Sequence, residues 1–445
     1  MPHLRSERGE PLDWRADLPR ASEFGGTVKR PSGKLKPGPG RPAAEVADHQ
    51  QERIRGALLE LVAEHGYAGI TVRKLAGRAG VSTRSFYQHY PGKEACFLSA
   101  HQFAVRRVLQ VVEEASCDAH GVVDRCLRLV VDAVIREWAA EPRAAYLMLV
   151  GAYAADLPAL RQARLASRSI EARIGECLEC APDDAGLAPL AAEAIVAGVF
   201  TATRCRLLDG EGDLGDLCEP LGRWAAAYRE LPAKRIEEIS LAHLVATSHD
   251  EAPSSGGEER IAVAEDGDRG LLLTAAAKLV ASRGRADLGL EEIASTAGIS
   301  RRGFEAEFLD PEACVAAAHR LYADRAIDHV VRAEEDAAPA AQLASLGAQV
   351  AADPTLASLC FSDVAIAGPR LVRSHHRFLS RVASLAAGTT EAPGPAAEAS
   401  AGALWGLLRQ RVVMGRAAQA AEIAPALASL ALLPLRAETS RLSAS

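Results

Sequence analysis

The amino-acid sequence predicts an all-α protein made of two tandem helical domains. The chain has 445 residues, which is room for two or three domains of ordinary size. Apolar residues make up 49% of it and aromatic residues only 4%, a composition suited to helices that pack through small aliphatic side chains. A helical pattern near residue 71 also recurs near residue 289. A repeat this long indicates duplication of a whole domain rather than a solenoid.

Two segments without apolar periodicity divide the chain. Residues 1–44 are rich in Gly and Pro, and we expect them to form a disordered arm. Residues 247–267 form an acidic linker rich in Pro, Gly and Ser. The predicted domains are therefore residues 45–246 and 268–445. The arm carries five cations with no acidic residue among them: Lys29, Arg30, Lys34, Lys36 and Arg41.

The first domain opens with a helix-turn-helix pattern over residues 49–97. Its first helix has an apolar stripe at i, i+3, i+4, i+7 and i+8, formed by Ile54, Ala57, Leu58, Leu61 and Val62. A short second helix follows Thr71, a good N-cap, and ends at Gly80, where the chain must turn sharply. Ser82 or Thr83 caps a third helix that is short, polar and free of acidic residues. Such a helix is typical of a reader of the DNA major groove.

The segment also carries a more specific pattern of core, turn and polar residues at fixed spacing. Its members are Thr71, Arg73, Leu75-Ala76, Ala79-Gly80-Val81-Ser82, Phe86-Tyr87, His89-Tyr90 and Lys93-Glu94. With these positions the segment resembles the tetracycline-repressor (TetR) family of bacterial transcription regulators. The resemblance implies a regulator, most often a repressor, that binds a double-stranded DNA operator and is released by an unknown small-molecule ligand. It assigns base reading to Arg73, Thr83, Arg84, Ser85 and Gln88. It assigns phosphate contacts to Thr71, Tyr87, His89 and Lys93. Beside such a motif, the cationic arm is expected to reach along the DNA backbone or into the minor groove, the alternative being a solubilising tail.

The pattern recurs in residues 268–315 at an offset of 218. Nine of 27 positions are identical between 71–97 and 289–315, mostly in the core and the turn. Residues that would face DNA in the first copy are replaced in the second by Glu291, Glu292, Glu305, Glu307 and Pro311. Residues 49–97 have seven Lys or Arg against four Asp or Glu, net +3, whereas residues 267–315 have six against eight, net −2. Because DNA binding is largely neutralisation of phosphates, the second copy is predicted to be degenerate, although Arg301 and Arg302 keep DNA contact open as the alternative.

Further helices are expected after each helix-turn-helix. They lie near 122–139, 143–156, 159–180, 187–208 and 215–229, and near 312–333, 338–351, 354–366, 369–387, 395–414 and 419–433. The resemblance implies that these helices enclose a ligand pocket and form a dimerisation face, either between two chains or as a pseudo-dimer within one chain. Small residues in 191–208 and 397–414 suit such close helix packing. Candidate pocket residues in the first domain are Tyr146, Met148, Tyr153, Phe200 and Arg204. In the second domain they are His375, His376, Trp405 and Arg409, with ordinary core or surface roles as the alternative for each.

The sequence gives little support to other classes of protein. Nine scattered cysteines, with Cys177 and Cys180 as the one close pair, predict reduced thiols in a cytoplasmic protein without a metal site. The apolar run near 423–435 contains two prolines and is expected to be too short to span a membrane. No sequence motif of an enzyme or cofactor site is present, and the Gly-rich stretch 210–215 is predicted to be a helix-ending loop. The alternative to a DNA-binding regulator is a ligand-sensing or protein-interaction protein that keeps the fold without specific DNA binding.

Overall fold

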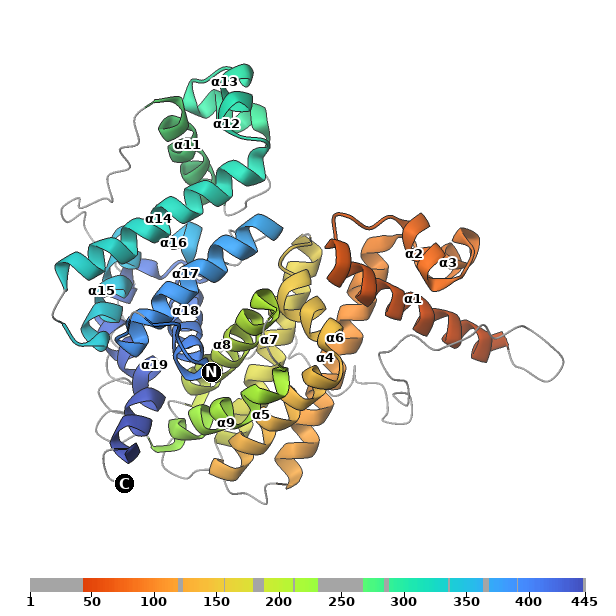
Figure 1. Ribbon diagram of the computed structural model, residues 1–445, viewed down its shortest axis with the longest axis horizontal. Helices are drawn as coiled ribbons and strands as arrows, with labels where there is room; N and C mark the ends of the chain where they lie inside the picture. The colour runs from red at the N-terminus through yellow and green to blue at the C-terminus, as the bar shows by residue number, and fades with distance from the viewer. Residues whose placement is uncertain are drawn as a thin grey trace.

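A computed structural model describes most of the two predicted domains (Figure 1). The described residues are 43–118, 123–155, 157–178, 188–210, 213–230, 267–283, 288–334, 337–362, 368–389 and 391–442. Every regular element in these ranges is a helix, so the predicted all-α class is confirmed. Residues 1–42 of the predicted arm and 247–266 of the predicted linker lie outside the described ranges.

The first half begins with three helices that form a small head at the right of Figure 1, and continues into a larger helical body. The head consists of α1 (Ala43–His65), α2 (Val72–Ala79) and α3 (Thr83–His89). The body consists of α4 (Lys93–Asp118), α5 (Val123–Ala140), α6 (Pro142–Tyr146), η2 (Leu147–Gly151), α7 (Leu157–Leu178), α8 (Ala188–Asp209), η3 (Leu214–Leu217), α9 (Cys218–Ala226) and η4 (Ala227–Glu230).

The second half has the same order of elements, with its head at the top of Figure 1. This head consists of α11 (Asp268–Arg283), α12 (Leu290–Ala297) and α13 (Arg301–Glu307). The body consists of α14 (Pro311–Ala333), α15 (Pro339–Ala352), α16 (Pro354–Cys360), α17 (Pro369–Ala387), α18 (Pro395–Val413), η5 (Ala417–Gln419) and α19 (Ala420–Leu442). The bounds of α12 and α13 are those of α2 and α3 shifted by 218 residues.

The two halves meet through α8 and α18, which pack against each other along a seam of small residues. A Cβ on Gly402 would lie 2.4 Å from the Cβ of Thr201, and one on Gly406 would lie 2.5 Å from the Cβ of Ala197. Trp224 of α9 adds a buried hydrogen bond, donating from Nε1 to Ser400 Oγ at 3.0 Å. Because α9 also contacts α18 and α19, four helices from the two halves share one packed region.

Two boundary expectations were wrong. Helix α1 begins at Ala43 and so takes in the last two residues of the predicted arm, because Ala is a strong helix former and Val46 is buried. Helix α19 continues through Pro425 and Pro434, and the window 417–436 is long and apolar enough to cross a membrane by length and composition. Half of that window is buried inside the protein, where α19 packs on α15 and α18. This burial offsets the backbone hydrogen bonds that the prolines remove.

Candidate nucleic-acid interface

The turn between α2 and α3 is set by local chemistry. Thr71 caps α2, its hydroxyl accepting a hydrogen bond from the Lys74 amide at 3.2 Å. Gly80 ends the helix with φ of +64°, a left-handed conformation that a side chain would strain. Of the two predicted caps for α3, the structure uses Ser82, whose Oγ accepts from the Ser85 amide at 2.9 Å. Thr71 thus fixes the start of α2, and Gly80 and Ser82 fix the turn between α2 and α3.

Buried side chains and ion pairs hold the hairpin on α1. Leu75 and Phe86 are fully buried, and Phe86 contacts the ring of Tyr90 at 5.8 Å between centroids. On the polar side, Arg78 of α2 binds two carboxylates of α1, Glu60 at 3.0 Å and Glu64 at 2.8 Å. The hydrogen bond from this guanidinium holds the pKa of Glu64 below its usual value. These contacts, which sequence reasoning did not find, fix α2 against α1 and leave its opposite face exposed.

The exposed face presents most of the residues assigned to DNA. Six of the nine are exposed: Thr71, Arg73, Thr83, Arg84, Tyr87 and Gln88. Within the part of the chain that the structure describes, neither Arg73 nor Arg84 has an ion-pair partner, and α3 contains no acidic residue. Both guanidinium groups are therefore available to a base edge or a phosphate.

The other three assigned residues are partly buried and make contacts within the head. Lys93 donates from Nζ to the carbonyls of Tyr67 and Ile70, both at 3.3 Å, and lies 4.2 Å from the centre of the Tyr67 ring. His89 Nε2 lies 3.0 Å from Gln50 Oε1, and burial lowers the pKa of its imidazole. Ser85 accepts a hydrogen bond from the Ser82 hydroxyl at 2.9 Å. These three side chains thus stabilise the head itself, independently of any contact that they make with DNA.

The second head has the same cap on its third helix and the same helix-ending glycine as the first, but a different surface. Ser300 caps α13 and Gly298 ends α12 with φ of +71°, as Ser82 and Gly80 do in the first head. Its Arg301, however, lies 2.8 Å from both Glu291 and Glu305. The two carboxylates offset the positive charge of this guanidinium, which weakens its attraction for a DNA phosphate.

The five pocket candidates of the first half lie near one another, mostly packed into the core. Residues 147–151 form a π-helix where an α-helix was expected, and Arg204 Nε donates to the Leu149 carbonyl there at 2.8 Å. The Arg204 guanidinium also lies 4.6 Å from the centre of the Tyr153 ring. Phe200 packs on Trp138, Met148 is buried and Tyr146 is half-buried.

The second-half candidates divide between core and surface. His375 is buried against Trp405, with 4.9 Å between ring centroids, while His376 lies 2.9 Å from Asp209 of the first half. The Trp405 indole donates to the Cys360 carbonyl at 2.9 Å, and Arg409 lies over its ring at 5.5 Å. The two histidines point in different directions, as expected for neighbours on a helix.

No cluster of potential metal ligands occurs in the described ranges. Of the cysteines in those ranges, the seven whose side chains the structure describes are free, and six of these are buried. Cys180 lies outside them, as do two residues of the Gly-rich loop. Gly210 ends α8 with φ of +69°, in agreement with the predicted helix-ending loop.

Comparison with known proteins agrees with the geometry of the first head. Residues 54–100 match the family described as "Bacterial regulatory proteins, tetR family". The transcriptional repressor AcnR of Corynebacterium diphtheriae is 31% identical over 96 residues, which are 22% of this chain and 47% of AcnR. AcnR of Corynebacterium glutamicum is 33% identical over 89 residues, 20% of this chain and 44% of that protein. The chain thus spans less than half the length of these relatives.

Among solved structures, the fatty acid degradation regulator FadR from Bacillus halodurans is similar with a TM-score of 0.36 and 19% sequence identity. The similarity covers 43% of this chain and 97% of that one. The exposed, capped hairpin of α2 and α3 lies within the segment that matches this family. Over this segment the chain is similar to bacterial regulators of the TetR family.

Proposed function

We propose that this chain is a transcriptional repressor that binds its DNA operator through α2 and α3 of the first head and is released by a small-molecule ligand. The observation that carries the proposal is the contrast between the two heads. The first presents Arg73 and Arg84 without ion-pair partners beside an acid-free helix. The second has Arg301 paired with two glutamates. A protein of this kind acts at chromosomal DNA in the bacterial cytoplasm.

We further propose that the two halves are duplicated TetR-like domains that pair as an intrachain pseudo-dimer. The matching bounds and caps of the two heads support duplication. The packing of α8 on α18 supports pairing, because these helices occupy the same place in the order of elements of each half. The first half then supplies the DNA-reading head, and the second serves as dimerisation partner or sensor.

The test compares aligned arginines in the two heads. Arg84→Ala is expected to weaken binding to a selected operator by about 1–3 kcal/mol, the usual value of a specific base contact. Arg302→Ala is the matched control, since it removes the residue 218 positions later from an equally exposed site. Fluorescence anisotropy with labelled duplex, at two salt concentrations, measures both. Equal effects in the two variants, or no effect in either, would contradict the proposed reading head.

The competing function is a sensor or interaction protein that has kept the fold without specific DNA binding. It predicts that selection from random duplexes recovers no common sequence, and that affinity falls with salt equally for all duplexes. Recovery of a consensus whose binding depends on Arg84 would decide for the repressor.

A further inference from the structure

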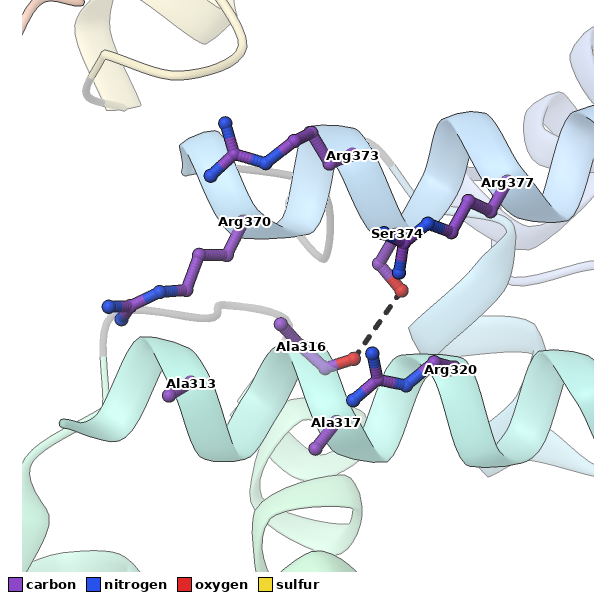
Figure 2. Close-up of a pocket in the computed structure, with 8 residues that line it drawn as sticks. All are labelled: Ala313, Ala316, Ala317, Arg320, Arg370, Arg373, Ser374 and Arg377. Carbon is purple, nitrogen blue, oxygen red and sulfur yellow. Dashed lines mark hydrogen bonds between the residues drawn. The ribbon is translucent and has the colours of Figure 1, made fainter. Parts of the chain in front are cut away.

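The second half contains a cleft lined by arginines between α14 and α17 (Figure 2). Arg320 extends from α14, while Arg370, Arg373 and Arg377 extend from α17. The rest of its lining is small: Ala313, Ala316, Ala317 and Ser374. In Figure 2, Arg320 and Arg377 reach toward Ser374 from opposite helices, and Arg370 lies nearer the start of α17.

Only one of the four guanidinium groups has an acidic partner within the described chain. Arg370 binds Asp310 at 2.5 Å, and its backbone amide donates to Glu312 Oε1 at 2.7 Å. Arg320, Arg373 and Arg377 are exposed and have no ion-pair partner in the described ranges. None of the eight lining residues is acidic. Three like charges around one cleft repel each other, and an anion between them would remove that repulsion.

The size and donors of the cleft indicate which anion fits. Its volume is about 240 Å³. At roughly 30 Å³ for one water, the space holds a compact ion, and it falls below the roughly 300 Å³ at which drug-sized pockets begin. Guanidinium groups bind phosphate through two parallel hydrogen bonds, which makes arginine the preferred partner of this group. The Ser374 hydroxyl lies 2.9 Å from His319 Nδ1 and 3.4 Å from the Ala316 carbonyl, so recognition falls to the arginines.

The segment that leads into α17, one wall of the cleft, also contacts the first half of the chain. The amide of Gly368, which precedes α17, donates to the carbonyl of Tyr153 in the first half at 2.9 Å. Helix α14, the other wall, follows directly after the second head. A ligand that holds α14 and α17 together would therefore act on the helices that connect the second head to the first half.

We propose that the cleft between α14 and α17 is a binding site for a small phosphate-bearing anion of two or more negative charges. Arg320 and Arg377, which reach toward Ser374, hold its oxygens, and Arg370 keeps the start of α17 fixed to α14. This inference gives a chemical class to the ligand of the proposed repressor, and to that extent it rests on the proposed function.

Calorimetric titration of the full chain without DNA tests the site independently of operator binding. The probes are inorganic phosphate, pyrophosphate and citrate, in low-salt buffer free of other phosphate and sulfate. Pyrophosphate is expected to bind saturably at one site per chain and more tightly than citrate. The Arg320→Ala/Arg377→Ala double variant should lose roughly tenfold or more in affinity, or about 1.4 kcal/mol. Arg332→Ala, an exposed arginine at the other end of α14, should bind as the wild type does.

Melting temperatures without ligand show whether each variant is folded. If the double variant is not, the single variant Arg377→Ala takes its place and should lose severalfold in affinity. Absence of saturable binding at millimolar pyrophosphate, equal binding by the double variant and the control, or tighter binding of citrate would each overturn the proposal. A double variant that loses operator affinity when the wild type binds no anion would show instead that the cleft contacts DNA. Failure to bind any operator, with pyrophosphate binding intact, would refute the proposed function and leave the site standing.

Discussion

Arg301 has carboxylate partners on two helices at 2.8 Å, whereas Arg84 of the first head has none in the described chain. Both residues are exposed arginines on the third helix of a helix-turn-helix, so residue type alone does not separate the heads. The difference comes from Glu291 and Glu305, which stand where the first head has Arg73 and Tyr87. The two heads thus share the turn between their second and third helices and differ in the charge beside it.

Lys93 is expected to stabilise the first head even in the absence of DNA. Its ammonium group donates to two carbonyls and lies over the Tyr67 ring, so Lys93→Ala removes charged hydrogen bonds that are typically worth about 1.5–3 kcal/mol each, part of which water replaces. Thermal unfolding of Lys93→Ala should therefore show a lower melting temperature, whereas the exposed Lys278→Ala should not. An unchanged melting temperature in Lys93→Ala would leave the phosphate contact as its main role.

Acid is expected to destabilise the protein through buried histidines. Burial, with a contribution from Arg320, lowers the pKa of His319 to about 4, and burial lowers that of His375 well below its usual value. The unfolded chain takes up these protons near pH 6.5, so the stabilisation is fully present above that pH and is lost as pH falls toward 4. For His319 the total is about 3 kcal/mol, since one pKa unit corresponds to about 1.4 kcal/mol.

Urea unfolding of His319→Asn at several pH values measures this effect. Asn is expected to keep a polar partner for Ser374, which lies 2.9 Å from His319 Nδ1, and its free energy of unfolding should depend less on pH between 6.5 and 4. His329→Asn, an exposed histidine on the same helix, should keep the wild-type dependence. Parallel curves for all three proteins would argue against a titrating His319.

At the scale of elements, local patterns in the sequence predict helices well and their partners poorly. Caps and glycines mark the ends of α2 and α3 because each works through neighbouring residues. By contrast, α19 continues through Pro434 to Leu442, beyond the end expected near residue 433, and its packing on α15 and α18 is not revealed by any local pattern. The same applies to single site residues. Lys93 meets carbonyls more than twenty residues earlier in the chain, and the arginine cleft joins helices about fifty residues apart.

The contact between α8 and α18 is expected to tolerate no side chain at Gly402. A Cβ there would lie 2.4 Å from the Cβ and Oγ1 of Thr201 and 2.7 Å from the Ala197 carbonyl oxygen, so the helices would have to separate. Overpacking of this kind costs typically about 1–3 kcal/mol. Gly402→Ala should therefore lower the free energy of urea unfolding. Gly175→Ala is the matched control, since its new Cβ would be 3.9 Å from Ala192 and alanine favours helix. Equal stability of the two variants would show that α8 and α18 are less tightly packed at Gly402 than in this structure.

At the scale of the whole molecule, the two heads leave the helical bodies at different places (Figure 1). The first has a net charge of +3 over residues 49–97, from seven basic and four acidic residues, whereas the second has a net charge of −2 over residues 267–315. TetR-type heads, like other helix-turn-helix readers, gain affinity when two of them bind half-sites one helical turn, or a multiple of it, apart. A single chain with one competent head forgoes this gain.

Tight binding to a palindromic operator is therefore expected to require two chains, with two competent first heads among four domains. Light scattering of the complex with a selected operator should give two chains per duplex, and a half-site duplex should bind one chain more weakly. The charge-reversing variant Arg301→Glu/Arg302→Glu should keep this stoichiometry and nearly all of the affinity, because Arg301 is already neutralised by Glu291 and Glu305. Arg73→Glu/Arg84→Glu is the matched variant in the first head and should abolish binding. If one chain bound the full palindrome tightly and the second-head variant abolished that binding, the second head would be a DNA reader and the pseudo-dimer would place two active heads on one operator.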